Sequence, residues 1–399
     1  MQLKNYWMNL KNSKIAITGF GAISPLGVDR KTIWKNYLTN DTFIQSIDFK
    51  GKPTFCAPLS EEGENQLSDI KSENKNYKHI DRTALLAIYA ARQAVKEAGW
   101  RDNQLKNTGV SLGSSRGATQ TWEHHHFRHL QNENLSPLAS PTTTLGSISS
   151  WVVQDQQFTG PSISHSMTCT TGLHAIANGM AWIKGGLCEK FLCGGSEASI
   201  TPFTIAQFKS LGLYTKEKSE YPCRPYSIEE KNTLCIGEGS AVFALELMNN
   251  QHELQKLATI LSVGFGMEKL TSSTSISYEG KGFEQSMRNA LENANIRNVD
   301  AIISHAPGTI DGDESELKAI YKVFGELYPI ILSNKWKIGH TFGASSVLSL
   351  EQALYVLQYQ KFTDYPYNVR IQLSHKPINT IMINAAGFGG NCVSMIVSR

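Results

Sequence analysis

The sequence predicts an α/β protein made of two similar halves, each with parallel strands covered by helices. Two observations lead to this fold class. Stretches rich in β-branched residues alternate with amphipathic stretches of helical spacing, which is typical of parallel sheets packed against helices. The same order of stretches also occurs twice along the 399 residues, which indicates a duplicated unit. We place the division near residue 253, so that residues 1–253 and 254–399 form the two halves.

Four pairs of segments carry this correspondence. Each pair matches in the type of element that it predicts: a β-branched strand running into a glycine turn, a strand ending in small residues, a polar turn before an amphipathic helix, and a strand ending in paired glycines. The pairs are residues 14–27 with 256–269, 109–117 with 301–309, 168–186 with 339–357, and 189–198 with 378–390. The N-terminal half is longer, and its surplus, residues 118–150 and 200–232, is predicted to form a cap or a dimer surface.

The composition is typical of a globular protein with reduced thiols. The formal net charge is only +3 and no long charged block occurs, so neither nucleic acid nor a membrane surface is favoured as a partner. No apolar run is long enough to span a bilayer, and residues 1–13 lack an apolar signal core, so we expect a cytoplasmic protein. The seven cysteines form no CxxC pair, which argues against a zinc module or a disulfide framework.

Cys169 lies just ahead of a predicted helix in 164-SHSMTCTTGLHAIANGMAWIKGG-186. The apolar residues that follow it recur at helical spacing, so its sulfur is placed at a helix N-terminus. Unpaired N–H groups and the positive end of the helix favour a thiolate there, which makes Cys169 a candidate nucleophile. The alternative is a small buried structural cysteine. A nucleophile would need a base and electrophilic help from elsewhere in the chain.

Two of the eleven histidines lie in loops of small residues that allow a substrate to approach closely. They are His305 in 304-SHAPGTIDGDESE-316 and His340 in 333-SNKWKIGHTFGAS-345. Ligands of α/β sheets bind beyond the carboxyl ends of strands, where these loops, Cys169 and Phe388 are predicted to lie. We therefore expect one site built from both halves. For either histidine alone, a hydrogen-bonded structural residue is the alternative.

The chain resembles the elongating β-ketoacyl-acyl carrier protein synthases, the KAS I/II type ketosynthases of the thiolase-like superfamily. The matching motifs run in order from end to end: ITGFGAISPLG, SMTCTTGLHAI, CGGSEA, CRPYS, GEGSAVFALE, SHAPGTIDGDESE, NKWKIGHTFGAS and NAAGFGGN. This resemblance implies a thiolase-like fold, in which two similar βαβ halves pack as an α-β-α-β-α layered sandwich. It also implies a dimer, either of this chain with itself or with a related ketosynthase-like subunit.

The activity that the resemblance implies is a decarboxylative Claisen condensation. Cys169 would accept an acyl group from the phosphopantetheine of an acyl carrier protein, and a malonyl carrier would then lose carbon dioxide and attack the thioester. Neutral His305 and His340 would donate hydrogen bonds to the enolate. The backbone N–H groups of Cys169 and Phe388 would form the oxyanion hole. This chemistry requires neither a cofactor nor a metal ion.

Further residues match the family's site. Lys335 and Glu316 match its active-site lysine and the accompanying acidic residue, with a merely structural ion pair as the alternative. The resemblance places the following residues against the substrate: Phe388 at an aromatic gate, and Thr271, Ser272 and Thr309 along the pantetheine channel. Arg116 departs from the family pattern, because it occupies a usually apolar place near the far end of the acyl pocket. His125 and His129 have a spacing that zinc ligands can adopt, but no further ligands surround them, so we predict no metal site.

Several departures from the family pattern favour a specialised substrate, such as a polyketide or polyene chain, over housekeeping fatty acid. Pro307 replaces a threonine and Ala386 replaces a gate phenylalanine. The loop over residues 223–239, altered over residues 227–235, is longer than usual and has Ser227 where aspartate is common. These departures leave two alternatives open. One is a non-catalytic partner subunit like a chain-length factor, and the other is an acyltransferase or thioesterase that does not condense. The joint presence of cysteine, lysine and both histidines favours the condensing enzyme.

Overall fold

The computed structural model describes residues 14–49, 51–101, 107–216, 218–248, 256–269, 277–326, 328–374 and 376–399. The strands are β1 (Ile15–Ile23), β2 (Gln45–Phe49), β3 (Lys52–Ala57), β4 (Thr108–Gly113), β5 (Ser162–His165), β6 (Lys190–Glu197), β7 (Ile236–Gly237), β8 (Gly239–Leu247), β9 (Ala258–Met267), β10 (Ala301–Ile303), β11 (Ile330–Leu332), β12 (Thr380–Gly387) and β13 (Asn391–Ser398).

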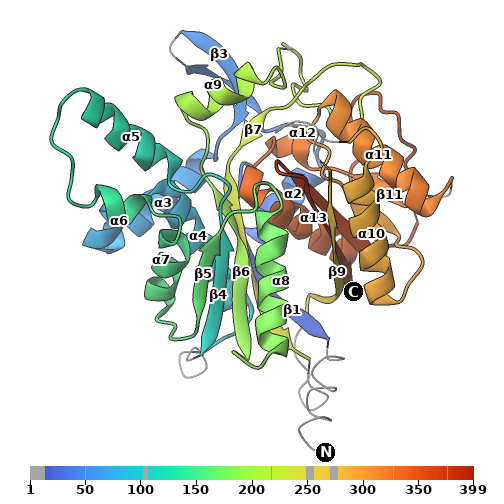
Figure 1. The fold of residues 1–399 in the computed structure, drawn as a ribbon, viewed down its shortest axis with the longest axis horizontal. Helices are drawn as coiled ribbons and strands as arrows, with labels where there is room; N and C mark the ends of the chain where they lie inside the picture. The colour runs from blue at the N-terminus through green and yellow to red at the C-terminus, as the bar shows by residue number, and fades with distance from the viewer. Residues whose placement is uncertain are drawn as a thin grey trace, which may run out of the picture.

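The helices cover both faces of the strands (Figure 1). They are α2 (Arg30–Tyr37), α3 (Glu61–Glu73), α4 (Arg82–Glu97), α5 (Thr119–Leu130), α6 (Ala139–Thr143), α7 (Ser147–Gln156), α8 (Thr171–Lys184), α9 (Pro202–Ser210), α10 (Lys281–Ala294), α11 (Ile310–Phe324), α12 (Lys335–Ile338) and α13 (Ser345–Tyr359), with 3-10 turns at Lys75–His79 and Phe342–Ala344. All of the strands and helices predicted in the four matched pairs of segments are present.

One sheet joins strands from both parts of the chain. Its order is β11-β10-β12-β13-β9-β1-β8-β6-β4-β5, and the two parts meet where β1 pairs antiparallel with β9. Outward from this junction the same arrangement occurs on each side, with β8 corresponding to β13, β6 to β12 and β4 to β10. The repeated order of elements is therefore a repeated topology. The division near residue 253 lies outside the described residues and stays a prediction.

The sheet is mixed, whereas the sequence predicted parallel strands. The β4–β6 and β10–β12 pairs are parallel, but β8 runs antiparallel to β1 and β6, and β13 runs antiparallel to β12 and β9. The reason is clearest at the C-terminus, where only residues 388–390 connect β12 to β13. A connection this short can form a hairpin but cannot cross over to a parallel strand.

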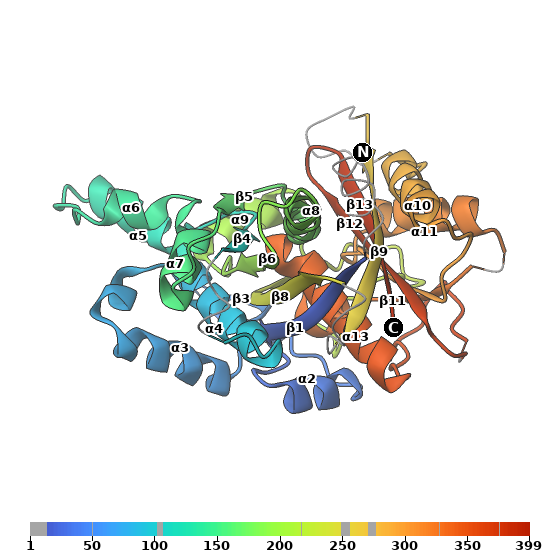
Figure 2. The same cartoon turned by 90° about the horizontal axis from the view of Figure 1, so that it is seen from below.

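The strands and helices form five layers. Helices α8 and α13 pack against each other and lie between the two groups of strands, α8 on β6 and β4, and α13 on β12 and β10. Helices α4 and α7 cover the outer face on one side, and α10 covers that on the other, with α11 packed against it (Figure 2). The central helix α13 is buried from Ser345 to Leu357, as a helix enclosed on all sides must be. The α-β-α-β-α sandwich that the sequence implied is confirmed.

Glycines inside β1 and β9 let a helix approach each strand closely. A Cβ atom at Gly19 or Gly21 would lie 2.5 or 2.2 Å from a backbone oxygen of α4. A Cβ atom at Gly264 or Gly266 would lie 2.2 or 2.1 Å from a backbone oxygen of α10. The sequence analysis placed glycines of residues 14–27 in a turn after the strand, but Gly19 and Gly21 lie within it. They are required by helix packing, because no larger residue fits.

The surplus segments of the N-terminal half lie at the periphery of the sandwich. Residues 118–150 form α5, α6 and the start of α7, and residues 200–232 begin with α9. Figure 1 shows α5 and α6 projecting from the edge of the molecule. Within the described ranges, no helix combines the length and the apolar character that crossing a bilayer requires.

Candidate active site

Cys169 lies in a tight turn between β5 and α8, two residues before the helix begins. The threonines around it build this turn. The Thr171 hydroxyl accepts a hydrogen bond from the N–H of Met167 at 2.8 Å and donates to the Thr168 carbonyl at 2.6 Å, and Thr170 Oγ1 donates to the Met167 carbonyl at 2.7 Å. Thr168 has a left-handed φ of 53°, a strained conformation that such contacts can maintain. The turn therefore holds the cysteine in a fixed position.

The thiol of Cys169 is buried, which corrects the expectation of a favoured thiolate. The residue is 7% exposed and packs in an apolar cluster that includes Phe208, Leu234 and Phe342. Burial raises the pKa of the Cys169 thiol to about 12, the charge of Glu197 raises it further, and the charge of Lys335 opposes this. The loss of hydration outweighs the helix N-terminus because apolar side chains from distant segments cover the sulfur. Cys169 is a thiol at neutral pH and needs a base.

His340 supplies a nitrogen at the required place. Its Nε2 atom lies 3.1 Å from Cys169 Sγ, although the residues come from different halves of the chain. The His305 ring stands at 89° to the His340 ring, with ring centroids 5.3 Å apart. The structure thus brings Cys169, His305 and His340 together in one site.

Both histidines are neutral at physiological pH. Burial lowers the pKa of His305 to about 3, and the charge of Lys335 contributes to this. Burial also lowers the pKa of His340 well below its ordinary value, with His305 and Lys335 adding to the effect. Each neutral ring carries one N–H donor and one nitrogen acceptor. The pair can therefore accept a proton and donate hydrogen bonds without placing positive charge in the site.

Lys335 is a buried cation with neutral partners. It is 1% exposed, and its Nζ donates to Asn334 Oδ1 at 3.0 Å and to Ser349 Oγ at 3.1 Å. Burial lowers the pKa of Lys335 to about 8, while the charge of Glu316 opposes this shift. The ion pair with Glu316 that the sequence left open is not formed among the described residues, because each side chain is held by other groups. The positive charge of Lys335 lowers the pKa values of Cys169, His305 and His340 without a direct contact.

Glu316 holds the loop that carries His305. Its two oxygens accept hydrogen bonds from the backbone N–H groups of His305 at 3.1 Å and Ala306 at 2.8 Å, and from the Asn384 amide at 3.0 Å. Burial raises the pKa of this carboxyl. Glu316 is therefore a positioning residue whose partners are two backbone N–H groups and two side chains, the Asn384 amide and, at 3.4 Å, the Tyr226 hydroxyl.

Two acidic residues that position the site were missed by the sequence analysis. Asp313 accepts hydrogen bonds from the N–H groups of Gly308 and Thr309, beyond His305. Glu197 accepts from the N–H groups of Ser115 at 2.7 Å and Gly343 at 2.9 Å, and so connects both halves beside the cysteine. Both could have been found from their positions in the sequence, since each lies next to a loop of small residues. Asp313 is in the first turn of a helix, and Glu197 is at the end of a buried strand.

A cavity of about 430 Å³ opens onto Cys169, His305 and His340. Its lining also contains the following residues singled out from the sequence: Pro307, Thr309, Ala386 and Phe388. Thr271 and Ser272 lie outside the described residues. Arg116 is not part of this lining, because its guanidinium group bonds to the Gln207 side chain on α9.

The loop after β12 meets the cysteine turn closely. A Cβ atom at Gly387 would lie 1.9 Å from Thr168 Oγ1 and 3.0 Å from the backbone nitrogen of Cys169. The Thr168 hydroxyl also donates to the carbonyl of Phe388 at 3.3 Å. Glycine is therefore required at this position, and the backbone of Phe388 is held beside the backbone of Cys169.

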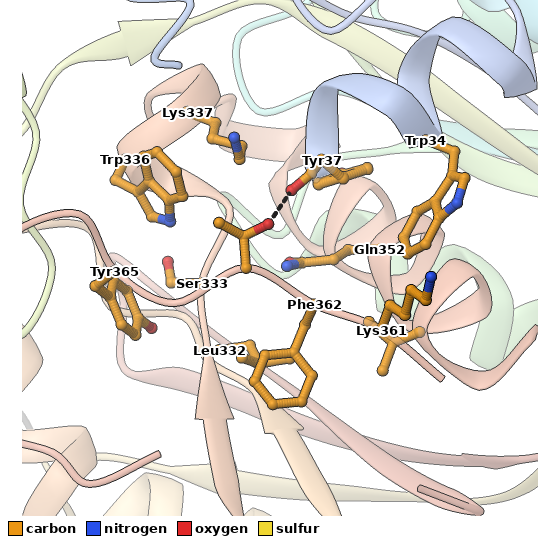
Figure 3. A pocket seen from close by; sticks show the side chains of 12 residues that line it. Trp34, Tyr37, Leu332, Ser333, Trp336, Lys337, Gln352, Lys361, Phe362 and Tyr365 are labelled. Atoms are coloured by element: carbon orange, nitrogen blue, oxygen red, sulfur yellow. Dashed lines mark hydrogen bonds between the residues drawn. The ribbon is translucent and has the colours of Figure 1, made fainter. Parts of the chain in front are cut away.

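The short helix α12, which carries Lys335, is anchored from its outer side. The Lys337 Nζ donates to the carbonyls of Asn36, Thr39 and Asp41 at 3.0, 2.6 and 3.1 Å, and it lies 4.1 Å from the centre of the Trp336 ring. Figure 3 shows the Trp336 and Lys337 side chains at a small pocket of about 10 Å³, which is about the size of one water molecule. The three hydrogen bonds of Lys337 to these backbone carbonyls hold α12 in place.

Within the part of the chain that the structure describes, no three histidine, cysteine or acidic side chains are grouped so that they could hold a metal ion. All seven cysteines fall within the described ranges and are buried and free of disulfides.

Comparison with known proteins matches most of the chain to one family. The model of the β-ketoacyl synthase N-terminal domain matches residues 12–250, and that of the β-ketoacyl synthase C-terminal domain matches residues 257–365. The 3-oxoacyl-[acyl-carrier-protein] synthase 2 of Staphylococcus aureus (strain N315) is 28% identical over 410 residues, covering 98% of this chain and 99% of that protein. The protein of the same name from Coxiella burnetii is also 28% identical, with the same coverage.

Solved structures of ketosynthases share the fold. A β-ketoacyl synthase from Burkholderia phymatum has a TM-score of 0.85 at 22% identity, covering 97% of this chain and 99% of that chain. The ishigamide ketosynthase/chain length factor has a TM-score of 0.84 at 20% identity, with the same coverage. These findings confirm the resemblance drawn from the sequence motifs, and the chain belongs to the β-ketoacyl synthase family.

Proposed function

We propose that this protein is a β-ketoacyl-acyl carrier protein synthase that joins an acyl group held on Cys169 to the two carbons left when a malonyl carrier loses carbon dioxide. One observation carries the proposal: the Cys169 thiol touches His340 Nε2 at 3.1 Å, and a second neutral histidine, His305, faces the same cavity. A nucleophile, a base and two neutral donors are the groups that this reaction needs.

The first half-reaction transfers the acyl group. The proton of Cys169 passes to Nε2 of His340, and Sγ attacks the carbonyl carbon of the acyl thioester on the carrier. The bond between that carbon and the carrier's sulfur breaks, and the pantetheine thiol leaves with the proton. Transfer to a base at the moment of attack accounts for reactivity in a thiol whose pKa is about 12.

The second half-reaction needs His340 in its other role. Once Sγ carries the acyl group, Nε2 of His340 no longer faces a thiol proton. A shift of the neutral ring's single proton from Nδ1 to Nε2 then lets His340 donate a hydrogen bond into the cavity. Carbon dioxide leaves the malonyl group, and the ring N–H groups of His305 and His340 stabilise the enolate oxygen. The enolate carbon then bonds to the thioester carbon, the bond from that carbon to Sγ breaks, and the Cys169 thiolate that leaves takes up a proton from the solvent. The product is a β-ketoacyl carrier.

Backbone donors stabilise the tetrahedral intermediates in this proposal. The N–H groups of Cys169 and Phe388 belong to the two turns that Gly387 brings into contact. An oxyanion formed at the thioester carbon lies within reach of both turns. Such donors contribute about 10²–10³-fold each to acyl transfer.

The alternatives are a non-catalytic partner subunit and an acyltransferase or thioesterase. A scaffold has no need for Cys169 and His340 in contact, nor for two neutral histidines on one cavity. An enzyme that only transferred acyl groups would need the base but no second ring facing the substrate. The site therefore supports the condensing enzyme over both, although Pro307 and Ala386 depart from the family pattern.

Product analysis with purified carriers tests this proposal. The protein is incubated with an acyl carrier and a malonyl carrier, and the carrier-bound products are measured by mass spectrometry. We expect a β-ketoacyl product two carbons longer than the starting chain, formed by the wild type but not by Cys169→Ala. Formation of free acid or transferred acyl groups without chain extension contradicts condensation.

The aromatic lining of the cavity supports a specialised acyl chain. Phe208 stacks on Phe388 with ring centroids 6.3 Å apart, and both rings line the cavity. Phe342, which is outside this lining, meets Phe208 edge-on at 4.8 Å. Such a wall favours flat, conjugated chains because aromatic faces stack on planar groups. We infer a polyketide or polyene chain as the substrate. A panel of saturated and conjugated acyl carriers of equal length measures this preference.

We infer that the protein forms a dimer, with itself or with a related ketosynthase-like subunit. Strand β5 is the last strand of the sheet and carries the half-exposed Ile163, so its outer edge is open to pairing. Helix α5 adds exposed Trp122, Phe127 and Leu130, more apolar surface than an isolated monomer typically presents on one helix. Light scattering after gel filtration measures the assembly.

The partner in catalysis that we propose is an acyl carrier protein, met in the cytoplasm. A groove lined by Lys209, Lys216 and Lys218 adjoins the catalytic cavity, because residues 211–215 contribute to the walls of both. Carrier proteins are acidic, so a basic groove at the cavity mouth suits their docking. Replacing Lys216 and Lys218 by glutamate is expected to raise KM for acyl carriers without changing acylation by free acyl-pantetheine.

A further inference from the structure

Two buried side-chain atoms in the lining of the catalytic cavity have no hydrogen-bond partner among the described residues. One is Nδ1 of His340, which belongs to the base. The other is Oε2 of Glu268, a residue that is 5% exposed and takes no part in the proposed condensation. A buried acceptor without a donor is destabilising, more so when it is charged, so such an atom calls for an explanation.

Glu268 is held rigidly by its surroundings. Its Oε1 accepts a hydrogen bond from the N–H of Gly282, in the first turn of α10, at 2.5 Å. Its backbone N–H donates to the carbonyl of Gly390 at 2.8 Å. A Cβ atom at Gly282 would lie 2.9 Å from Glu268 Cγ, and one at Gly390 would lie 3.2 Å from Glu268 Cβ. The position of the carboxylate is therefore fixed. Its Oε1 is hydrogen-bonded to the N–H of Gly282, whereas its Oε2 has no donor.

No group of the described lining donates a hydrogen bond to this oxygen, although the lining contains the side chains of Asn232, Thr309 and Cys392. The described lining contains no lysine or arginine, and its two histidines are neutral. The positive end of α10 lies beside Glu268 and stabilises its negative charge. A molecule that enters the cavity can therefore supply the donor that this oxygen lacks within the chain. A carboxylate group is repelled there, whereas an N–H or O–H group is attracted.

The substrate proposed above brings such donors on its carrier arm. Phosphopantetheine contains two secondary amides between its thiol and its phosphate, whereas malonyl carboxylates and hydrocarbon chains contribute no N–H group. The arm must cross this cavity for its thioester to reach Cys169. The loop over residues 387–390 lies against the cysteine turn at Gly387 and against Glu268 at Gly390. A ligand that touches Cys169 and follows this loop passes Glu268.

We propose that Glu268 Oε2 accepts a hydrogen bond from an amide N–H of the phosphopantetheine arm and so sets the depth at which the thioester enters the site. This inference rests on the proposed function, since the arm is that of the acyl carrier. Glu268 is a substrate-binding residue in this account, with its other oxygen fixing its direction.

The test removes the donor and the acceptor separately. Acyl-pantetheine is compared with two analogues in which one amide or the other is replaced by an ester, and kcat/KM for acylation of Cys169 is measured for the wild type and Glu268→Gln. Glutamine keeps an acceptor for Gly282 but presents an NH₂ group to the arm. For wild type, we expect one ester analogue to react about 10–100-fold more slowly than the amide, the range for hydrogen bonds to charged groups. For Glu268→Gln, we expect a difference below about 3-fold.

Asp311→Asn is the matched control, because Asp311 is an exposed carboxylate on the same cavity lining. This variant should discriminate between amide and ester as strongly as wild type. Equal discrimination by wild type and Glu268→Gln, or none by the wild type, overturns the inference. If Glu268→Gln fails to fold, the comparison of acyl-pantetheine with its ester analogues in the wild type still tests whether an amide N–H contributes to acylation. Failure of the proposed function would look different: the wild type would not be acylated even by unmodified acyl-pantetheine or acyl carriers.

Discussion

Cys169 Sγ and His340 Nε2 lie 3.1 Å apart across 171 positions of sequence. The contact joins a turn of the N-terminal half to a loop of the C-terminal half, and neither residue would be reactive by itself. The thiol is buried and has a raised pKa, and the imidazole is buried and has a lowered pKa. Both shifts favour the neutral pair, so the proton leaves sulfur only when an acyl carbon is in reach.

The neutral pair predicts how Cys169 reacts with iodoacetamide. Because burial raises the pKa of the thiol to about 12, the rate of alkylation should rise steadily from pH 6 to pH 9, about tenfold for each pH unit. The measurement is the rate of Cys169 modification followed by intact mass. A plateau that begins near pH 6 would mean a thiolate paired with a charged histidine and would contradict the account.

Two buried charges should shift this reactivity in opposite directions. The charge of Glu197 raises the pKa of Cys169 and that of Lys335 lowers it. At pH 7.5, Glu197→Gln should therefore be alkylated faster than wild type, and Lys335→Met more slowly. Glu229→Gln, at a half-exposed surface position, serves as a control and should leave the rate unchanged. Changes of the same sign in both buried variants would rule out a field effect.

The histidines should be separable by the step that they support. In His305→Gln, Cys169 keeps its contact with His340, so acylation should persist while decarboxylation of malonyl carrier falls about 10²–10³-fold, the loss typical for one donor to a developing charge. In His340→Gln, both steps should slow because the base is lost. Release of carbon dioxide and formation of the acyl-enzyme are measured separately. Equal loss of both steps in His305→Gln would contradict the assignment.

Glu316→Gln should destabilise the fold, although it changes only one charged group. The carboxylate accepts from two backbone N–H groups and the Asn384 amide, and a glutamine NH₂ group would meet one of these donors. We expect a loss of about 1–3 kcal/mol in the free energy of unfolding, measured with urea. Glu314→Gln is the matched control, because its pairs with Lys318 and Arg370 are solvent-accessible and worth less than about 1 kcal/mol. Equal losses in both variants would contradict this role.

Glu197 should make stability depend on pH. Burial raises its pKa from 4.5 to about 7 in the folded protein. Its stabilising contribution is therefore fully present below pH 4.5 and is lost as the pH rises through 7, because the unfolded chain releases the proton first. The advantage of wild type over Glu197→Gln in urea unfolding should thus be smaller at pH 7.5 than at pH 5. An advantage that grows with pH would contradict the raised pKa.

The repeated α/β topology was predictable because it follows from patterns that are local in the sequence, whereas the five layers were implied only by the family resemblance. Alternating β-branched and amphipathic segments predicted the strands and helices, and their repeated order predicted the repeated topology. The direction of the strands was harder to predict from the sequence. Strand β13 is antiparallel because a connection of only three residues makes it a hairpin with β12, and this hairpin was not recognised. Gly19 and Gly21 were assigned to a turn for the same reason: close approach of α4 is a tertiary requirement.

The sequence motifs predicted which residues form the site, but they could not predict how deeply these residues are buried or which groups surround them. The side chains that bury Cys169 come from α9, from residue 234 and from the turn after His340, so the direction of its pKa shift depends on packing. The neutral partner of Lys335, Ser349, lies on α13 and replaces the carboxylate that the sequence suggested. Glu268 gave no signal in the sequence, because its importance lies in an oxygen left without a donor.

Intact-mass spectrometry of the acyl-enzyme tests the central claim most directly. Purified protein is incubated first with an acyl carrier and then with a malonyl carrier, with Cys169→Ala treated in parallel. The account predicts that wild type gains the mass of one acyl group, that Cys169→Ala gains none, and that the added mass disappears as the malonyl carrier is converted to a chain two carbons longer. No acylation with any carrier, or acylation that persists in Cys169→Ala, would contradict it.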